Sequence, residues 1–279
     1  MRSLITALAV VGVGIWGLLV GALWRYQEAV LFPAPSVDVA LLDAVAERIG
    51  AEAVRMVADD GQPLYAWLHP AQGRERGVVF YLHGNGETLN DTVSLQRELV
   101  QRGWTVFKLS PRGYPGSPGA PSEEGFRRDL TAAWAWLTTE RGVDPSRVVI
   151  HGRSMGGGLA GHLLNSTSPG AVVLESTFTS TVAVARHRFP WAPAQWLLRH
   201  RFETGRSLQG LTVPTLVLHG AADRIVPVTE GRALARTGPH IAYVEEPRFD
   251  HNDGLVLRGP NAGPAYWAFL ESFAAGAMQ

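Results

Sequence analysis

The chain has 279 residues, of which 25 are basic and 25 acidic, and it contains no cysteine. This length suits one large domain with a proper core, or at most two small ones, and the hydrophobic content of 46% excludes a disordered chain. The balanced charge, with no basic stripe, leaves no footprint for nucleic acid, and the absence of cysteine excludes disulfides, thiol catalysis and cysteine-ligated metals.

The first feature along the chain is the uncharged run Leu4–Trp24. As a helix it would span about 31 Å, the hydrocarbon thickness of a bilayer. Arg2 precedes the run, and Arg25 and Tyr26 follow it as interfacial anchors. We therefore expect residues 1–25 to form a single-pass transmembrane anchor that is not cleaved.

Two other interpretations of this run stay open. Val20-Gly21-Ala22 resembles the small-residue cleavage site of a signal peptide, and a helix buried in a soluble core is also apolar. The slight positive excess before the run favours an inside N-terminus and an outside domain. The arginine-rich composition, with Lys108 as the only lysine, is typical of a GC-rich bacterium. Together these features predict a bacterial inner membrane with the domain in the periplasm.

After the run, residues 26–50 are expected to form a connector, and residues 51–279 show short apolar runs that alternate with helical stretches. The predicted strands are Ala53–Val57, Leu64–Leu68, Val78–Leu82, Thr105–Leu109, Val148–Ile150, Val172–Leu174, Thr215–Leu218 and Ile241–Val244. The predicted helices include Thr88–Arg102, Ser122–Arg141, Met155–Leu164, Thr229–Ala235 and Ala265–Ala274. This alternation predicts an α/β fold with a mostly parallel, eight-stranded, doubly wound sheet that opens with two antiparallel strands.

The motif Gly152-Arg-Ser-Met-Gly156 lies between a predicted buried strand and a predicted helix. A turn this tight strains the backbone of Ser154, and only glycine at the two flanking positions lets the chain pass so closely. In return, the Ser154 hydroxyl stands exposed at the carboxyl end of the strand. This arrangement is a nucleophile elbow, so Ser154 is the candidate nucleophile.

A serine at its free pKa is a poor nucleophile, so a base and an orienting acid must accompany it. Asp223 follows the carboxyl end of the next buried strand but one, and His251 lies on a loop after the last strand. The chain order of serine, acid and histidine is the order of nucleophile-elbow enzymes. We therefore expect Asp223 to orient His251 and His251 to act as the base.

Several other polar residues compete for these roles. Asp250 and Asp253 flank His251, but immediate neighbours on a loop seldom fold back to orient a ring. The same cluster suggests a metal site only weakly, because no second ligand group with zinc-like spacing accompanies it. Five other histidines are weighed as bases. His83, His151 and His219 are expected to hydrogen-bond loops, and His187 and His200 are expected at the solvated surface, with a contact to substrate as the alternative.

The reaction also needs two amides that hold an oxyanion, each worth roughly 3 kcal/mol in the transition state. One is the amide after the nucleophile, at Met155. The other is expected in the loop after the third strand, where glycines on both sides of Asn85 leave its amide free to point at a substrate.

The motifs FYLHGNGET, KLSPRGYPGSPGAPSEEG, HGRSMGGGLA, ESTFTS, LVLHGAADRIVP and DHND occur in an order that resembles membrane-anchored α/β-hydrolases. These are the bud-emergence-mutant-related and α/β-hydrolase-domain proteins, which include depalmitoylases and bacterial peptidase-like relatives. The resemblance covers about Ala51 to Phe273. It implies an α/β-hydrolase fold with Ser154, Asp223 and His251 as the triad and with Asn85 and Met155 as oxyanion donors. The chain departs from the usual pattern at Ser110-Pro111, where relatives carry Asp-Tyr, and at the inserted Pro115.

The segment 181–211 interrupts the alternation of strands and helices and is rich in tryptophan. We expect a small helical cap whose aromatic residues line an acyl pocket, and a purely structural insertion is the alternative. The predicted function is a serine hydrolase that needs no cofactor and no metal. Its predicted substrate is a small acyl ester or thioester, lipid-derived or part of an acylated protein. A peptidase or amidase with the same triad and a non-catalytic membrane-tethered scaffold remain as alternatives.

Overall fold

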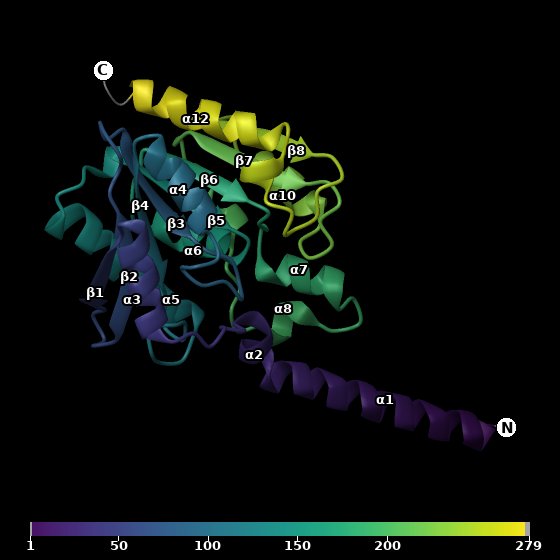
Figure 1. The fold of residues 1–279 in the computed structure, drawn as a ribbon. Helices are drawn as coiled ribbons and strands as arrows, with labels where there is room; N and C mark the ends of the chain where they lie inside the picture. Colours follow the sequence, from purple (N-terminus) through teal and green to yellow (C-terminus); the bar gives the residue numbers. More distant parts are fainter. Residues whose placement is uncertain (1, 277–279) are drawn as a thin grey trace.

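The computed structural model describes residues 2–276, and its centre is one eight-stranded sheet (Figure 1). The strand order is β1-β2-β4-β3-β5-β6-β7-β8. β2 pairs antiparallel with β1 and β4, and every other pairing is parallel. The strands are β1 Glu52–Val57, β2 Pro63–His69, β3 Gly77–Leu82, β4 Trp104–Ser110, β5 Val148–Arg153, β6 Ala171–Glu175, β7 Thr215–Gly220 and β8 Ile241–Glu246.

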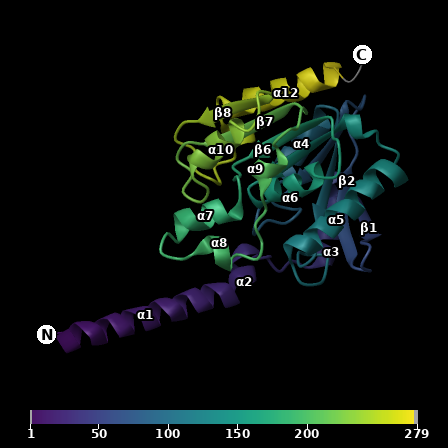
Figure 2. The same cartoon turned by 180° about the vertical axis from the view of Figure 1, so that it is seen from behind.

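Helices cover both faces of the sheet, as a sheet with continuous apolar strands requires. α4 (Val93–Gln101) and α12 (Ala262–Gly276) pack on one face (Figure 1), where Leu99 and Tyr266 are fully buried. α5 (Glu123–Ala135) and α6 (Met155–Leu164) pack on the other face, which Figure 2 shows from behind. Two short helices follow the last two strands, α10 (Val228–Ala235) after β7 and α11 (Leu255–Arg258) after β8.

The structure confirms the predicted fold, and each observed strand contains its predicted range. The start predicted for the helix at Thr88 is wrong, because α4 begins at Val93. The Asp91 carboxylate accepts hydrogen bonds from both the amide and the hydroxyl of Thr88, at 2.7 Å each. The Asp91 side chain thus forms a local turn with the backbone, and the helix begins only after this turn. The helix predicted to run to Arg141 ends its regular part at Ala135 and continues as one wider turn.

The segment expected to be a connector contains two helices, α2 (Gln27–Leu31) and α3 (Val39–Ile49). Asp38 caps α3, since its carboxylate accepts a hydrogen bond from the Ala40 amide. The apolar side of α3 packs on Trp67 of β2 in a separate buried cluster. The segment therefore covers part of the sheet in addition to linking α1 to it.

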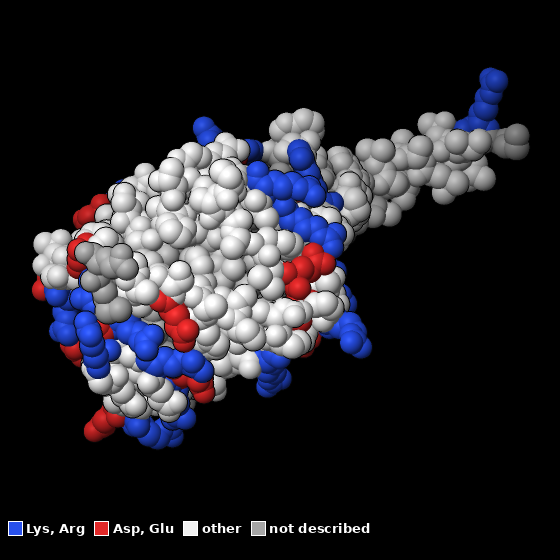
Figure 3. Space-filling model, turned by 90° about the horizontal axis from the view of Figure 1, so that it is seen from above, with Lys and Arg blue, Asp and Glu red and all other residues white. Residues whose placement is uncertain are grey.

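α1 (Arg2–Arg25) extends away from the domain, and none of its residues is buried (Figures 1 and 2). It is the one described helix that is long and apolar enough to cross a membrane by length and composition. In the face seen in Figure 3, acidic and basic side chains mix at the edge far from α1, the middle of the face is largely uncharged, and basic side chains overlie the base of α1 in this view.

Candidate active site

The turn between β5 and α6 holds Ser154 in a rare backbone conformation, with φ 53° and ψ −118°. Such a conformation costs about 1–3 kcal/mol and persists only where neighbouring contacts fix it. Two contacts do so here. The Ser154 amide donates to the Glu175 carbonyl at 2.8 Å, and the Thr177 hydroxyl donates to the Ser154 carbonyl at 2.7 Å.

The two motif glycines are required by packing. A Cβ on Gly152 would lie 2.5 Å from the Gly156 carbonyl oxygen, and a Cβ on Gly156 would lie 2.0 Å from the Leu82 carbonyl oxygen. Both distances are shorter than any tolerated contact with backbone. The sequence motif therefore produces the strained turn that it predicts, because no other residue fits at either position.

The three side chains expected to act together are in contact, although they lie far apart in the sequence. His251 Nε2 lies 2.9 Å from Ser154 Oγ, and His251 Nδ1 lies 2.7 Å from Asp223 Oδ2. All three residues are buried. This geometry lets the imidazole accept the hydroxyl proton on one side while the carboxylate accepts a hydrogen bond from its other nitrogen.

Asp223 is held as a carboxylate. Burial alone would raise its pKa, but hydrogen bonds from His219 and His251 outweigh burial and hold the pKa well below its usual range. The amides of Ile225 and Val226 also donate to Asp223 Oδ1, at 2.9 and 2.8 Å. The group facing His251 is therefore negatively charged at neutral pH.

The competing acids face elsewhere. Asp250 accepts hydrogen bonds from the amide and the side chain of Arg224, at 2.9 and 2.6 Å, and Asp253 accepts from the Asp250 amide at 2.7 Å. Asp250 touches His251 only through the backbone amide of the histidine. Within residues 2–276 no three histidine, cysteine or acidic side chains converge as a metal site would require.

The loop that carries Asn85 lies against the nucleophile. A Cβ on Gly84 would lie 3.3 Å from the Cβ of Ser154, and the Gly84 amide donates to Glu87 at 2.7 Å. Gly86 has a φ of +72°, which favours glycine. Met155 is the first residue of α6, so its amide is among those without a partner inside the helix. Both residues expected to hold an oxyanion therefore lie on segments that border Ser154.

The only lysine of the chain holds the far end of this loop. Lys108 on β4 is buried, and its amino group donates to the Leu89 carbonyl and to Gln96 Oε1. Burial lowers the pKa of Lys108 to about 7, despite the opposing effect of Glu87 and Asp91.

This lysine should make stability depend on pH. Its folded pKa lies below the unfolded value of about 10.4, so the unfolded chain binds more protons between these values. The free energy of unfolding therefore rises with pH across this window, by at most about 1.4 kcal/mol per pH unit from this group. We expect Lys108→Met to flatten the rise between about pH 7 and 9 in urea unfolding. If the free energy of unfolding rose with pH equally in the wild type and in Lys108→Met, Lys108 would not be the origin of the pH dependence.

The five other histidines weighed as bases only partly follow the expectation. His83 and His219 contact loop carbonyls, those of Gly84 and Val226. His151 instead contacts Glu175 and Tyr266, at 3.1 and 3.2 Å.

His187 is exposed, as expected, whereas the surface position expected for His200 is wrong. His200 is buried, its ring packs on Phe32, and it lies 3.3 Å from Glu28. His200 is buried because α2 and the residue that follows it, Phe32, pack against it. No sequence pattern revealed this contact between distant segments.

Arg153, the residue before the nucleophile, is a site residue that sequence reasoning missed. It donates to the His251 carbonyl and to Asn252 Oδ1, both at 2.9 Å, and it pairs with Glu87. Glu87 in turn accepts from Gly84. One buried guanidinium thus joins the histidine loop to the loop of Asn85. The available signal was a charged residue inside an otherwise small and apolar motif.

The loop that departs from the family pattern borders the site. Tyr114 donates to Asn85 Oδ1 at 3.3 Å, and Ser110 donates to the Pro115 carbonyl at 2.8 Å. Arg112 fixes the loop through Asp129, with distances of 2.6 to 2.9 Å. A hydrogen bond therefore joins two of the residues at which the chain departs from the family pattern, Ser110 and Pro115.

A mostly parallel eight-stranded sheet with a serine on a strand-to-helix turn defines the α/β-hydrolase class. Residues 73–206 match the hydrolase family described as serine aminopeptidase, S33. The chain is 32% identical to an uncharacterized protein of Mycobacterium tuberculosis, over 85% of this chain and 84% of the relative. The chain belongs to the α/β-hydrolase family.

Other similar proteins include a membrane protein and proteins of known structure. An uncharacterized membrane protein of Saccharomyces cerevisiae is 28% identical over 91% of this chain and 90% of its own length. The crystal structure of an α/β-hydrolase from Vibrio vulnificus has a TM-score of 0.70 at 23% identity and covers 92% of both chains. An esterase from Pyrococcus furiosus has a TM-score of 0.64 at 17% identity, over 86% of this chain and 97% of its own.

Proposed function

We propose that the protein is a serine hydrolase that cleaves carboxylic ester or thioester bonds through an acyl-enzyme on Ser154. The observation that carries the proposal is the pair of contacts made by His251, at 2.9 Å to Ser154 Oγ and at 2.7 Å to Asp223. The esterase of known structure with the same fold supports it.

In the proposed reaction, His251 Nε2 takes the Ser154 proton while Oγ attacks the substrate carbonyl carbon. The amides of Asn85 and Met155 hold the oxyanion, and Asp223 orients the imidazole and stabilises its charged form. The protonated imidazole then gives its proton to the departing alkoxide or thiolate. Water, deprotonated by the same histidine, attacks the acyl-enzyme, and the carboxylic acid leaves with Ser154 restored.

A peptidase or amidase with the same triad is the second candidate, because the matched family is described as serine aminopeptidase. Ester, thioester and aminoacyl-amide substrates with a common acyl group should be assayed side by side. We expect turnover of the ester and thioester to exceed that of the amide. Preferential cleavage of the amide would move the assignment to a peptidase.

We further propose that residues 1–25 anchor the enzyme in a membrane, with residues 51–279 as the catalytic domain and 181–211 as its cap. The apolar helix α1 and the membrane-protein relative from yeast support the anchor. The cap contains α7 (Thr181–Arg188), α8 (Ala194–Leu197) and α9 (Thr204–Ser207). A periplasmic domain on a bacterial inner membrane is part of the same proposal.

Arg153 is proposed as a positioning residue for this reaction. Arg153→Met removes the side-chain contacts to the His251 carbonyl, Asn252 and Glu87. Because small displacements of reacting groups are costly, we expect kcat on a short ester to fall roughly 10- to 100-fold with little change in KM.

Arg224→Met is the matched control, since Arg224 contacts the same histidine loop through Asp250 but is exposed. We expect kcat of this variant to stay within about threefold of the wild type. An equal loss of kcat in both variants, or a rise in KM alone for Arg153→Met, would contradict the positioning role.

A further inference from the structure

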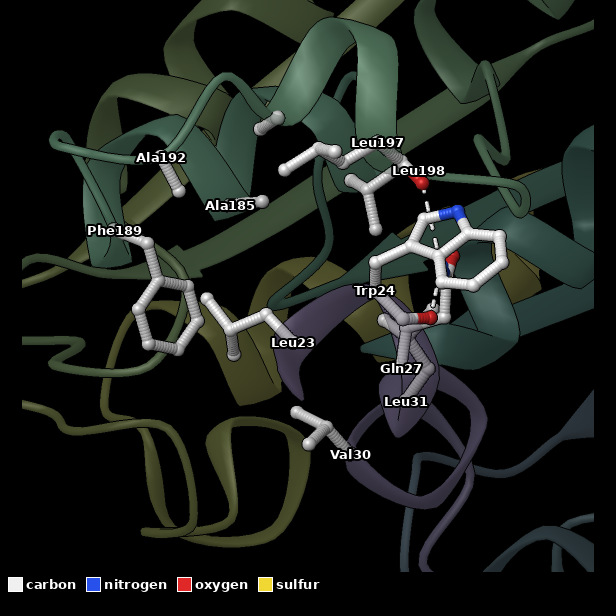
Figure 4. A pocket seen from close by; sticks show the side chains of 11 residues that line it. Leu23, Trp24, Gln27, Val30, Leu31, Ala185, Phe189, Ala192, Leu197 and Leu198 are labelled. Carbon is white, nitrogen blue, oxygen red and sulfur yellow. Dashed lines mark hydrogen bonds between the residues drawn. The ribbon is translucent and has the colours of Figure 1, made fainter. Parts of the chain in front are cut away.

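An apolar cavity lies between the end of α1, helix α2 and the cap (Figure 4). Leu23 and Trp24 of α1 and Val30 of α2 line one side, and Ala185 and Phe189 lie across from them. Gln27 is the only polar side chain in the lining, and the protein itself satisfies its amide. That amide donates to the Trp24 and Leu197 carbonyls and accepts from the Arg199 amide. The lining thus suits a hydrocarbon ligand.

The cap also reaches along α1. The Trp16 indole donates to the Trp191 carbonyl at 3.0 Å. Trp16 precedes Arg25 by nine residues, so this contact lies about 13 Å from the domain end of the helix. If Arg25 marks the bilayer interface, the cap loop around Trp191 lies at the depth of the hydrocarbon.

The exposed side chains around the cavity suit this position. Trp191 and Trp196 of the cap are 44% and 80% exposed, an unfavourable arrangement in water and a common one at a membrane interface. Arg186 and Arg188 of α7 are exposed and flank Ala185 and Phe189, which face the end of α1 across the cavity, and basic side chains overlie the base of α1 in the view of Figure 3. Basic side chains near a membrane surface attract anionic headgroups.

A short segment of the chain runs from the cavity wall to the candidate active site. Leu31, in the cavity wall, packs against the same core cluster that contains Met155. Two residues further on, the Pro33 carbonyl oxygen lies 3.7 Å from the point where a Cβ on Gly86 would stand. The short stretch 31–33 therefore runs from the cavity to the loop that carries Asn85.

From these observations we propose that the cavity holds the fatty-acyl chain of a lipid ester that remains in the bilayer while its ester group reaches Ser154. The inference rests on the proposed hydrolase function and names its substrate class. The anchor helix then has a second role, because its last turn forms part of the substrate site. The chain enters sideways from the bilayer between α1 and the cap, so the lipid need not cross water.

The first test is independent of catalysis. The full-length protein is placed in nanodiscs that contain a phospholipid with a photoactivatable diazirine in its acyl chain, and the cross-linked peptides are identified by mass spectrometry. We expect cross-links to α2 and to residues 185–198. Ala185→Phe fills the cavity and should reduce these cross-links at least about fivefold, if a bulky ring displaces the chain.

Ala183→Phe is the matched control. It lies on the same helix two residues away, which places it about 200° round the axis, and it is not part of the lining. We expect its cross-links to equal those of the wild type. Cross-links confined to α1, or unchanged in Ala185→Phe, would overturn the proposal.

The second test compares short and long acyl esters in the same nanodiscs. We expect Ala185→Phe to lower kcat/KM on a long-chain ester by about 10-fold or more while turnover of a butyrate ester is retained. An equal effect on both esters, or none, would reject the cavity and leave the hydrolase assignment intact. A wild-type protein that cleaves no ester would reject the hydrolase assignment, and the cross-linking would then decide the cavity alone.

Discussion

Ser154→Ala is expected to lower the turnover of a short p-nitrophenyl ester by on the order of 10⁴-fold or more, because alanine has no hydroxyl that could form the acyl-enzyme. The same variant should lose labelling by a fluorophosphonate probe, which reacts only with an activated serine. The fold should persist, because alanine keeps the backbone contacts to Glu175 and Thr177.

Ser176→Ala is a strict control for this experiment. Ser176 is also buried, follows the carboxyl end of the neighbouring strand, has a positive φ of 49° and has no partner for its hydroxyl among the described residues. We expect this variant to keep both labelling and turnover. Full activity in Ser154→Ala, or loss of labelling only in Ser176→Ala, would end the assignment. Absence of labelling in the folded wild type would favour a non-catalytic scaffold.

Asp223→Asn is expected to lower kcat by about 10⁴-fold, the second large effect. The amide has the same shape as the carboxylate, but it cannot stabilise the imidazolium and it favours the wrong imidazole tautomer. The measurement is kcat on the same ester, with circular dichroism to verify folding.

Asp250→Asn separates this role from mere proximity, because Asp250 is adjacent to His251 in sequence. Its Oδ1 accepts from the amides of Arg224 and His251, and an asparagine oxygen can do the same. The lost charge affects only an exposed ion pair with Arg224, so we expect kcat to stay within about threefold of the wild type. The opposite ranking of the two variants would make Asp250 the orienting acid.

The sequence predicted the strands, the elbow and the chain order of the site because these depend on local rules. Continuous apolar runs mark strands that are buried on both faces, and glycine on each side of Ser154 marks a turn that only glycine allows. The prediction at Thr88 failed for an equally local reason, since the apolar periodicity concealed the turn made by Asp91.

The roles of the N-terminal segment and the cap depended on distant contacts. A connector was expected where α2 and α3 pack, and His200 was expected at the surface where Phe32 buries it. The contact of Trp16 with the Trp191 carbonyl joins residues 175 positions apart. No periodicity or motif encodes which two distant apolar segments meet, because their pairing is chosen by the packing of the whole chain.

For the candidate site, the sequence alone determined which residue types are present and at which strand ends they stand. The sequence already favoured Asp223 over Asp250 as the acid, and in the structure Asp223 contacts the imidazole. Only the tertiary structure decided that Arg153 joins two loops through Glu87 and the His251 carbonyl. The physical reason is that motifs specify backbone geometry over a few residues. The direction of a side chain across the sheet edge depends on loops that fold against one another from distant parts of the chain.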